Sequence, residues 1–92
     1  KKDVPPELQR LARKLEKVWS AVQAFADDSG RKLSPVFIRL PTRKELPNYY
    51  ELINRPIDMV KIQRKIQRFD YYDAEACRQD FLLMYSNAQL YN

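Results

Sequence analysis

Apolar side chains recur at helical spacing in three stretches of this 92-residue chain. In the first stretch they alternate spacings of three and four residues, which marks one face of an amphipathic helix. That face consists of Leu8, Leu11, Leu15, Val18, Val22 and Phe25. Pro5 and Pro6 suit a first helical turn, where a missing N–H costs nothing. The pattern predicts a tail at residues 1–4 and a first helix over about 6–27.

Two more stretches have the same period. The apolar face of the second is Met59, Ile62, Ile66 and Phe69, and that of the third is Ala74, Cys77, Phe81, Met84, Ala88 and Tyr91. Asp58 and Asp73 stand where N-cap residues are favoured. We predict a second helix over about 58–69 and a third over about 73–92. Further apolar residues widen the third arc, so we expect its burial on more than one side; they are Leu82, Leu83, Tyr85 and Leu90. Trp19 and Cys77 fall in the apolar stripes and are predicted to be core.

The segment between the first two helices follows neither period. It runs over about 28–57 and holds four of the six prolines, and we expect Pro47 and Pro56 to interrupt any helix there. Residues 42–46 could form a short helical turn. The segment is too apolar for a flexible linker, and long structured loops in compact domains are usually functional. The sequence therefore predicts one all-α domain with a long packed loop.

Composition restricts the chemistry. The chain has one cysteine, Cys77, and no histidine. This disfavours a structural zinc site and a nucleophile activated by histidine, and it fits a reducing compartment. We expect neither enzymatic activity nor a cofactor. No apolar run approaches the length of a membrane span.

The net charge of +5 is unevenly distributed. Residues 59–69 contribute four basic side chains and no acidic one: Lys61, Arg64, Lys65 and Arg68. A second basic stripe on the first helix consists of Arg10, Arg13, Lys14 and Lys17. Such stripes are most often solvated helix faces, and the alternative is non-specific binding of nucleic acid. The last helix is expected to be acidic, through Asp70, Asp73, Glu75 and Asp80.

Four ordered motifs carry a resemblance to a known family. Four segments together resemble a bromodomain: residues 34–41, 45–53, 55–59 and 86–92. The loop sequence looks closest to those of the bromodomains of polybromo and of Brahma-type chromatin-remodelling ATPases. The resemblance covers essentially the whole chain. It implies a left-handed four-helix bundle that reads acetylated lysine in histone tails.

The resemblance also implies a set of site residues. Asn92 matches the asparagine that donates to the acetyl carbonyl, and Tyr49 matches the tyrosine that reaches this carbonyl through a water. Phe37 lies nearest the family's shelf phenylalanine. The apolar wall would be Val36, Leu40 and Leu46, and the flanking positions on the third helix would be Asn87 and Tyr91. The family's usual Trp-Pro-Phe shelf is replaced by Pro-Val-Phe at 35–37, so the rim is expected to differ.

The chemistry of these residues agrees with such a site. An acetylated lysine ends in a neutral amide with a methyl group, which needs apolar walls and one or two uncharged polar groups. Unmodified lysine is an ammonium, which is costly to bury without a partner. From the pattern alone, however, the tyrosine pair at 49–50 could simply fill the core, and Asn92 could be a C-cap.

The family's fourth helix would follow Asn92, so we expect it to be missing or truncated here. Apolar faces of the first and third helices would then stay exposed, which favours poor stability or self-association. The resemblance implies a nuclear module whose partners are acetylated histone tails and other subunits of a chromatin complex, with DNA as a further candidate and no membrane. The alternatives are a basic helical module for nucleic acid and a bromodomain with a non-functional pocket.

Overall fold

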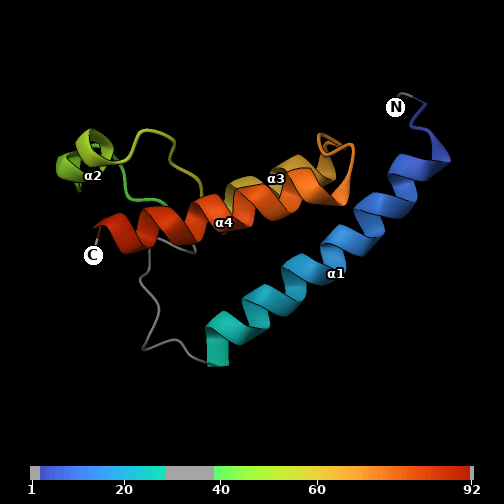
Figure 1. Cartoon of the computed structure of the whole chain (residues 1–92), viewed down its shortest axis with the longest axis horizontal. Helices are drawn as coiled ribbons and strands as arrows, with labels where there is room; N and C mark the ends of the chain where they lie inside the picture. The colour runs from blue at the N-terminus through green and yellow to red at the C-terminus, as the bar shows by residue number, and fades with distance from the viewer. Residues whose placement is uncertain (1–2, 29–38, 92) are drawn as a thin grey trace.

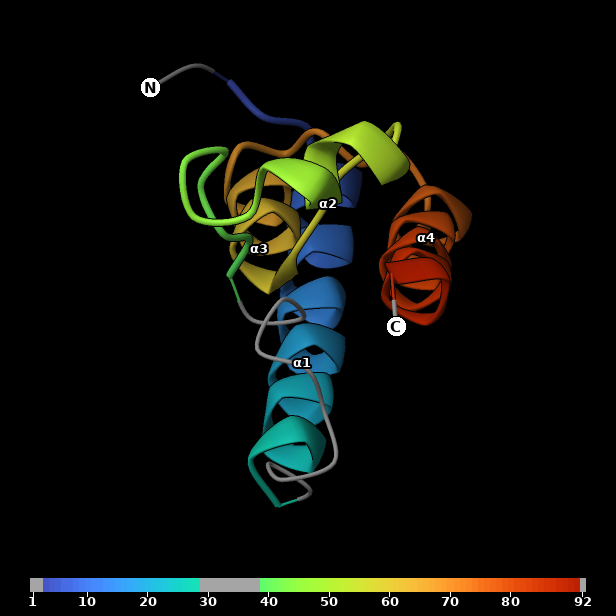
Figure 2. The same ribbon diagram turned by 90° about the vertical axis from the view of Figure 1, so that its left-hand side faces the viewer.

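The protein is all-helical in this computed structural model, which describes residues 3–28 and 39–91 (Figure 1). The helices are α1 (Pro6–Asp28), α2 (Pro47–Leu52), α3 (Met59–Gln67) and α4 (Ala74–Tyr91). The described ranges contain no strand, in agreement with the predicted fold class. α1, α3 and α4 contact one another in pairs, and Figure 2 shows α3 and α4 on opposite sides of the α1 axis. Within these ranges, no helix combines the length and apolar character that a membrane crossing needs.

The segment expected to be loop over about 28–57 contains the short helix α2. Pro47, which we expected to interrupt a helix, is instead the first residue of this one. A proline at that position needs no hydrogen-bond partner for the N–H that it lacks, and its fixed φ suits the helix. Ile53 N donates to Tyr49 O at 2.8 Å and closes the last turn. The expectation of an irregular loop was wrong at Pro47–Leu52. No helix runs across Pro47, as expected, because Leu46 before it has non-helical backbone angles.

The main core lies where the apolar faces of α1, α3 and α4 meet. α3 buries Met59, Ile62 and Ile66 completely, as the spacing predicted. The other buried apolar side chains of this core are Leu15, Trp19, Ile57, Tyr71, Cys77, Phe81, Met84 and Ala88. The prediction that Trp19 and Cys77 are core residues is confirmed. Trp19 Nε1 also donates to Met59 O at 2.7 Å, which fixes α1 against the first turn of α3.

An apolar surface remains exposed along α1 and α4. Val18 is 47% exposed, Phe25 62% and Leu90 60%. A groove of about 410 Å³ between the two helices is lined by Leu15, Val18, Val22, Phe81 and Leu82, among others. The expected burial of α4 on more than one side is therefore wrong for the described residues. α4 packs one face against α1 and α3, and its outer apolar positions face the groove or solvent.

A buried carboxylate joins α3 to α4. Asp80 Oδ2 lies 2.7 Å from Lys65 Nζ and accepts a 2.6 Å hydrogen bond from the Tyr71 hydroxyl. Lys65 Nζ also lies 4.8 Å from the centre of the Tyr71 ring. Asp80, which was expected to make the last helix acidic, is therefore buried. Lys65, which was expected on a solvated basic face, pairs with it.

The same network changes two acid–base equilibria. Burial, together with the neighbouring Asp80 carboxylate, raises the pKa of Tyr71 well above its ordinary value. Burial, followed by the charge of Asp80, raises the pKa of the Cys77 thiol to about 11. Both groups are therefore held protonated in the folded protein at neutral pH.

α3 ends with Phe69 in the left-handed region, at φ 60°. Phe69 N donates to Ile66 O and Asp70 N donates to Lys65 O, at 3.1 and 2.9 Å, which is the Schellman arrangement. A residue with a Cβ adopts this conformation at a cost of about 1–2 kcal/mol, so glycine usually occupies the position. The spacing places Phe69 on the apolar face of the helix, but Phe69 lies two residues past the helix end.

The raised pKa of Tyr71 predicts a loss of stability in alkali. The unfolded chain ionises Tyr71 near the ordinary value of 10.0, whereas the folded chain resists ionisation, so the free energy of unfolding falls as pH rises above about 10. Tyr71→Phe should make this decline shallower, in urea unfolding measured over a pH series. Tyr72→Phe is the matched control, because Tyr72 is 76% exposed. An equally steep decline in Tyr71→Phe would contradict the assignment.

Candidate functional site

A second, smaller apolar cluster lies where α2 meets the C-terminal end of α4 (Figure 1). Tyr49 and Ile53 are its buried members, and four partly buried side chains pack against them: Leu40, Leu46, Tyr50 and Tyr91. We call these six residues the aromatic cluster. It brings together the long loop, α2 and the last turn of α4, which are far apart in the sequence.

Tyr49 is at the centre of the aromatic cluster. Its ring makes edge contacts with Tyr91, at 4.9 Å between ring centroids and 66° between planes, and with Tyr50, at 5.5 Å and 77°. Such tilted arrangements suit the charge distribution of aromatic rings. Tyr49 is 1% exposed, and burial raises the pKa of its hydroxyl, with smaller contributions from Tyr50, Asp58 and Tyr91. The hydroxyl therefore stays neutral and able both to donate and to accept.

Asp58 anchors the loop to α3. Its Oδ1 accepts from Lys61 N at 2.8 Å, which confirms the predicted N-cap. Its Oδ2 accepts from Leu40 N at 2.5 Å. One buried carboxylate thus fixes both the start of α3 and Leu40, a loop residue of the aromatic cluster.

The loop is also ordered by its own short-range contacts. Thr42 and Glu45 form a reciprocal pair, with Thr42 N donating to Glu45 Oε1 at 2.9 Å and Glu45 N donating to Thr42 Oγ1 at 3.1 Å. Leu46 N donates to Thr42 O at 3.0 Å, so the predicted turn over 42–46 is confirmed. Its sequence signal is the capping-box pattern, a threonine followed three residues later by glutamate.

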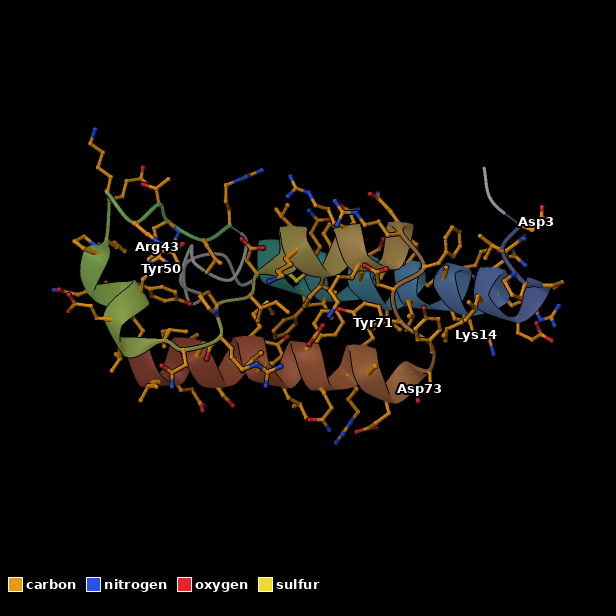
Figure 3. The ribbon with its side chains drawn as sticks, turned by 90° about the horizontal axis from the view of Figure 1, so that it is seen from above. Asp3, Lys14, Arg43, Tyr50, Tyr71 and Asp73 are labelled. Atoms are coloured by element: carbon orange, nitrogen blue, oxygen red, sulfur yellow. The ribbon has the colours of Figure 1, made fainter. Side chains whose placement is uncertain are left out.

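Tyr50 closes this turn onto α2. Its hydroxyl donates to Pro41 O, and the Arg43 guanidinium lies 4.6 Å from the centre of its ring. Figure 3 shows Arg43 and Tyr50 side by side at the α2 end of the molecule. A cation over an aromatic face is attractive, so Arg43 helps to hold the turn in place.

Asn87 connects α4 to the segment before α3. Its side-chain Nδ2 donates to Arg55 O at 2.8 Å, and the residue is buried. The amide donor is therefore used within the protein, and Asn87 positions the bend at 54–55. Asn87 is one helical turn before Tyr91 on α4.

The structure brings together four of the residues that the resemblance assigned to one site: Leu40, Leu46, Tyr49 and Tyr91. Asn87 lies on the same helix, and its contact is with the Arg55 carbonyl. Val36, Phe37 and Asn92 lie outside the described residues. A neighbouring hollow, whose lining also includes Leu40, is lined by Lys61, Arg64, Lys65 and Arg68.

Sequence reasoning missed three contributions to the site: two residues and one hydrogen bond. Ile53 could have been found from its spacing of four from Tyr49, had α2 been expected. Tyr50 was recognised only as part of a tyrosine pair, and its bond to Pro41 has no sequence signature. The bond from Leu40 to Asp58 spans 18 residues, so no local pattern could reveal it. Among the described residues, no three His, Cys, Asp or Glu side chains gather as metal ligands would.

Comparison with known proteins identifies relatives of the chain. Residues 15–92 match the sequence profile of the family described as Bromodomain. The chain is 42% identical over 84 residues to "ATP-dependent helicase brm" of Drosophila melanogaster, covering 91% of this chain and 5% of that protein. It is 37% identical over 82 residues to "Chromatin structure-remodeling complex subunit snf21" of Schizosaccharomyces pombe, covering 89% and 7%. It is 30% identical over 84 residues to "Transcription regulatory protein SNF2" of Saccharomyces cerevisiae, covering 91% and 5%.

The double role of Asp58 can be tested against the other N-cap. Asp73 Oδ1 accepts a single bond, from Ala76 N at 2.8 Å, and Asp73 is exposed. Asp58→Ala should lower the free energy of unfolding by about 2 kcal/mol, because the cap is lost and the Leu40 N–H loses its acceptor. Asp73→Ala should cost about 1 kcal/mol or less. Urea unfolding of both variants measures the difference, and equal losses would refute the second role.

Proposed function

The chain belongs to the bromodomain family, and on this premise we propose that it binds acetylated lysine at the aromatic cluster. The observation that carries the proposal is the 4.9 Å contact between Tyr49 and Tyr91. Tyr91 immediately precedes Asn92 in the sequence, and the bromodomain resemblance pairs Asn92 with Tyr49 in one site. The contact supports this pairing, since it joins α2 to the end of α4.

The chemistry of the cluster suits a neutral acetamide. Leu40 and Leu46 offer apolar surface to the methyl group and the lysine stem. We assign Asn92 as the donor to the acetyl carbonyl, because an amide donates without bringing a charge into the site. We assign the Tyr49 hydroxyl to a bridging water, and its raised pKa keeps it neutral for this role. Val36 and Phe37 complete the proposed apolar wall.

Discrimination against unmodified lysine follows from charge. An ammonium entering an apolar site loses hydration and needs an anionic partner in return. Asp58 is the nearby carboxylate, and each of its oxygens already accepts a backbone N–H. These two hydrogen bonds hold the carboxylate against the loop and α3. The acetylated side chain carries no charge and avoids this cost.

Asn87 acts in this proposal as a positioning residue. Its bond to Arg55 O holds the turn that leads into α3, and α3 holds the loop through Asp58. Asn87 would thus affect binding through the shape of the site, even though its own donor is engaged within the protein.

The relatives suggest a biological setting. Their names describe an ATP-dependent helicase, a subunit of a chromatin structure-remodeling complex and a transcription regulatory protein, and the chain spans only 5–7% of the length of these three proteins. We propose that the chain is a non-catalytic reader module of a nuclear protein of this kind. Its partners would be acetylated histone tails and the other subunits of the complex, and reading requires no cofactor.

Titration with acetylated and unmodified histone-tail peptides tests the proposal. The acetylated peptide should bind and the unmodified one should not, as measured by calorimetry. Asn92→Ala should weaken binding by about 1–3 kcal/mol, the worth of a lost hydrogen bond in a buried site. Tyr49→Phe should be milder, because it removes a water-mediated contact.

Asn48→Ala and Tyr72→Phe serve as controls for these two variants, because both residues are exposed. Equal binding of the two peptides would identify a non-functional or unrelated pocket. Full affinity in Asn92→Ala would remove Asn92 from the site.

A further inference from the structure

The charges around the aromatic cluster are unevenly distributed between the elements that form it. The loop, α2 and the bend before α3 carry exposed charged side chains: Arg39, Arg43, Lys44, Glu45, Glu51 and Arg55. On the α4 side, the last charged residue is Asp80, and residues 81–91 contain no charged side chain. The charge that a peptide meets beside the cluster is therefore determined by the loop and α2 rather than by the end of α4.

Arg43 places a cation directly against the aromatic cluster. Its guanidinium lies 4.6 Å from the centre of the Tyr50 ring, and the Tyr50 ring contacts the buried Tyr49. In Figure 3 the two labelled residues, Arg43 and Tyr50, lie together at the α2 end of the molecule. An aromatic ring attracts the guanidinium but does not neutralise it, and Arg43 is exposed. Its charge therefore acts on whatever approaches the edge of the cluster.

Two further cations belong to the same edge. Lys44 lies in the turn that ends at Leu46, and Arg39 immediately precedes Leu40, so each is attached to a segment that packs into the cluster. We call Arg39, Arg43 and Lys44 the cationic rim. Within residues 3–28 and 39–91, no carboxylate lies in ion-pair range of these three side chains. Their charges are therefore free to interact with a bound peptide.

The neighbouring carboxylates do not cancel this charge. Glu45 is tied to the turn, because its Oε1 accepts from Thr42 N at 2.9 Å, and Asp58 is buried with both oxygens accepting backbone N–H groups. Among the exposed side chains named above, four cations stand against two carboxylates, which leaves a net charge of +2. A peptide thus meets an excess of positive charge on this side of the site.

We propose that the cationic rim makes the site selective for an acetyl-lysine whose flanking residues are acidic or uncharged. The inference rests on the proposed function and adds a rule for the residues beside the modified lysine. Like charges brought together at an interface oppose binding, whereas opposite charges favour it. A second lysine beside the acetyl-lysine is therefore repelled unless it too is acetylated, since acetylation removes its charge. The preferred partner is an acetylated segment of low or negative net charge.

Three acetylated peptides that differ only in flanking charge test the selectivity on the full chain by calorimetry. Each contains one acetyl-lysine in a glycine–serine sequence with blocked ends, and the residues two positions before and after it are both Glu, both Ser or both Lys. At about 50 mM salt the Glu peptide should bind at least about 10-fold more tightly than the Lys peptide, with the Ser peptide between them. At about 500 mM salt the ratio should shrink to about 3-fold or less, because ions screen exposed charges.

A rim variant and a matched control locate the selectivity. The rim variant carries Arg39→Gln and Lys44→Gln, and the control carries Lys14→Gln and Lys17→Gln, which removes the same charge from exposed positions on α1. The readout is the ratio of the Glu-peptide and Lys-peptide affinities, because a change in the shape of the site would weaken both peptides alike. The rim variant should reduce this ratio to about 3-fold or less, whereas the control should keep it.

Two variants of Arg43 separate its charge from its contact with Tyr50. Arg43→Gln should lower the ratio, whereas Arg43→Lys keeps the charge and should preserve it. A purely structural role of Arg43 would weaken all three peptides equally and leave the ratio unchanged in both variants. That result would remove Arg43 from the specificity-determining residues.

The outcomes distinguish this selectivity from the proposed function itself. Equal affinity for the Glu and Lys peptides at low salt, or a preference for the Lys peptide, would overturn the selectivity and leave acetyl-lysine binding in place. A ratio lowered equally in the rim variant and the control would assign the effect to the net charge of the chain and not to the rim. Failure of all three acetylated peptides to bind would overturn the proposed function and the selectivity together. Equal binding of the Glu peptide with and without its acetyl group would do the same, because charge alone would then hold it.

Discussion

The buried carboxylate of Asp58 is the contact on which the arrangement of the candidate site depends. It accepts one N–H from the first turn of α3 and one from Leu40, which lies in the long loop. A buried carboxylate needs such donors, since without them its desolvation would be costly. The loop is therefore held by a group that α3 itself requires. The hydrogen bond to Asp58 thereby fixes Leu40, which packs in the aromatic cluster with Tyr49 and Ile53.

Local signals explain what the sequence could predict. The three long helices, the caps at Asp58 and Asp73 and the turn begun by Thr42 all depend on neighbours within a few positions. Long-range pairings escaped prediction, such as the bond from Leu40 to Asp58 and the ion pair of Lys65 with Asp80. The helix that begins at Pro47 was not predicted, because a proline can either begin a helix or interrupt one. Only the packing of the segment decides between these two outcomes.

The candidate site itself was predicted only in part. The resemblance pointed to Tyr49 and Tyr91, and the structure places their rings in contact. The resemblance did not predict the hydrogen bond from the Asn87 amide to Arg55 O, because the two residues are 32 positions apart in the sequence. Two chemically different surfaces then share Leu40 as a border, one apolar and uncharged and the other cationic.

The burial of Cys77 has a practical consequence. The chain has this single thiol, it is 2% exposed, and its pKa of about 11 keeps the reactive thiolate scarce at neutral pH. Alkylation requires a local movement that uncovers the thiol, which lines the floor of the groove between α1 and α4. The rate of alkylation therefore reports how often this site opens, in the way that amide exchange does for a backbone N–H. The protein carries its own probe of native-state opening, at a position where no label has to be introduced.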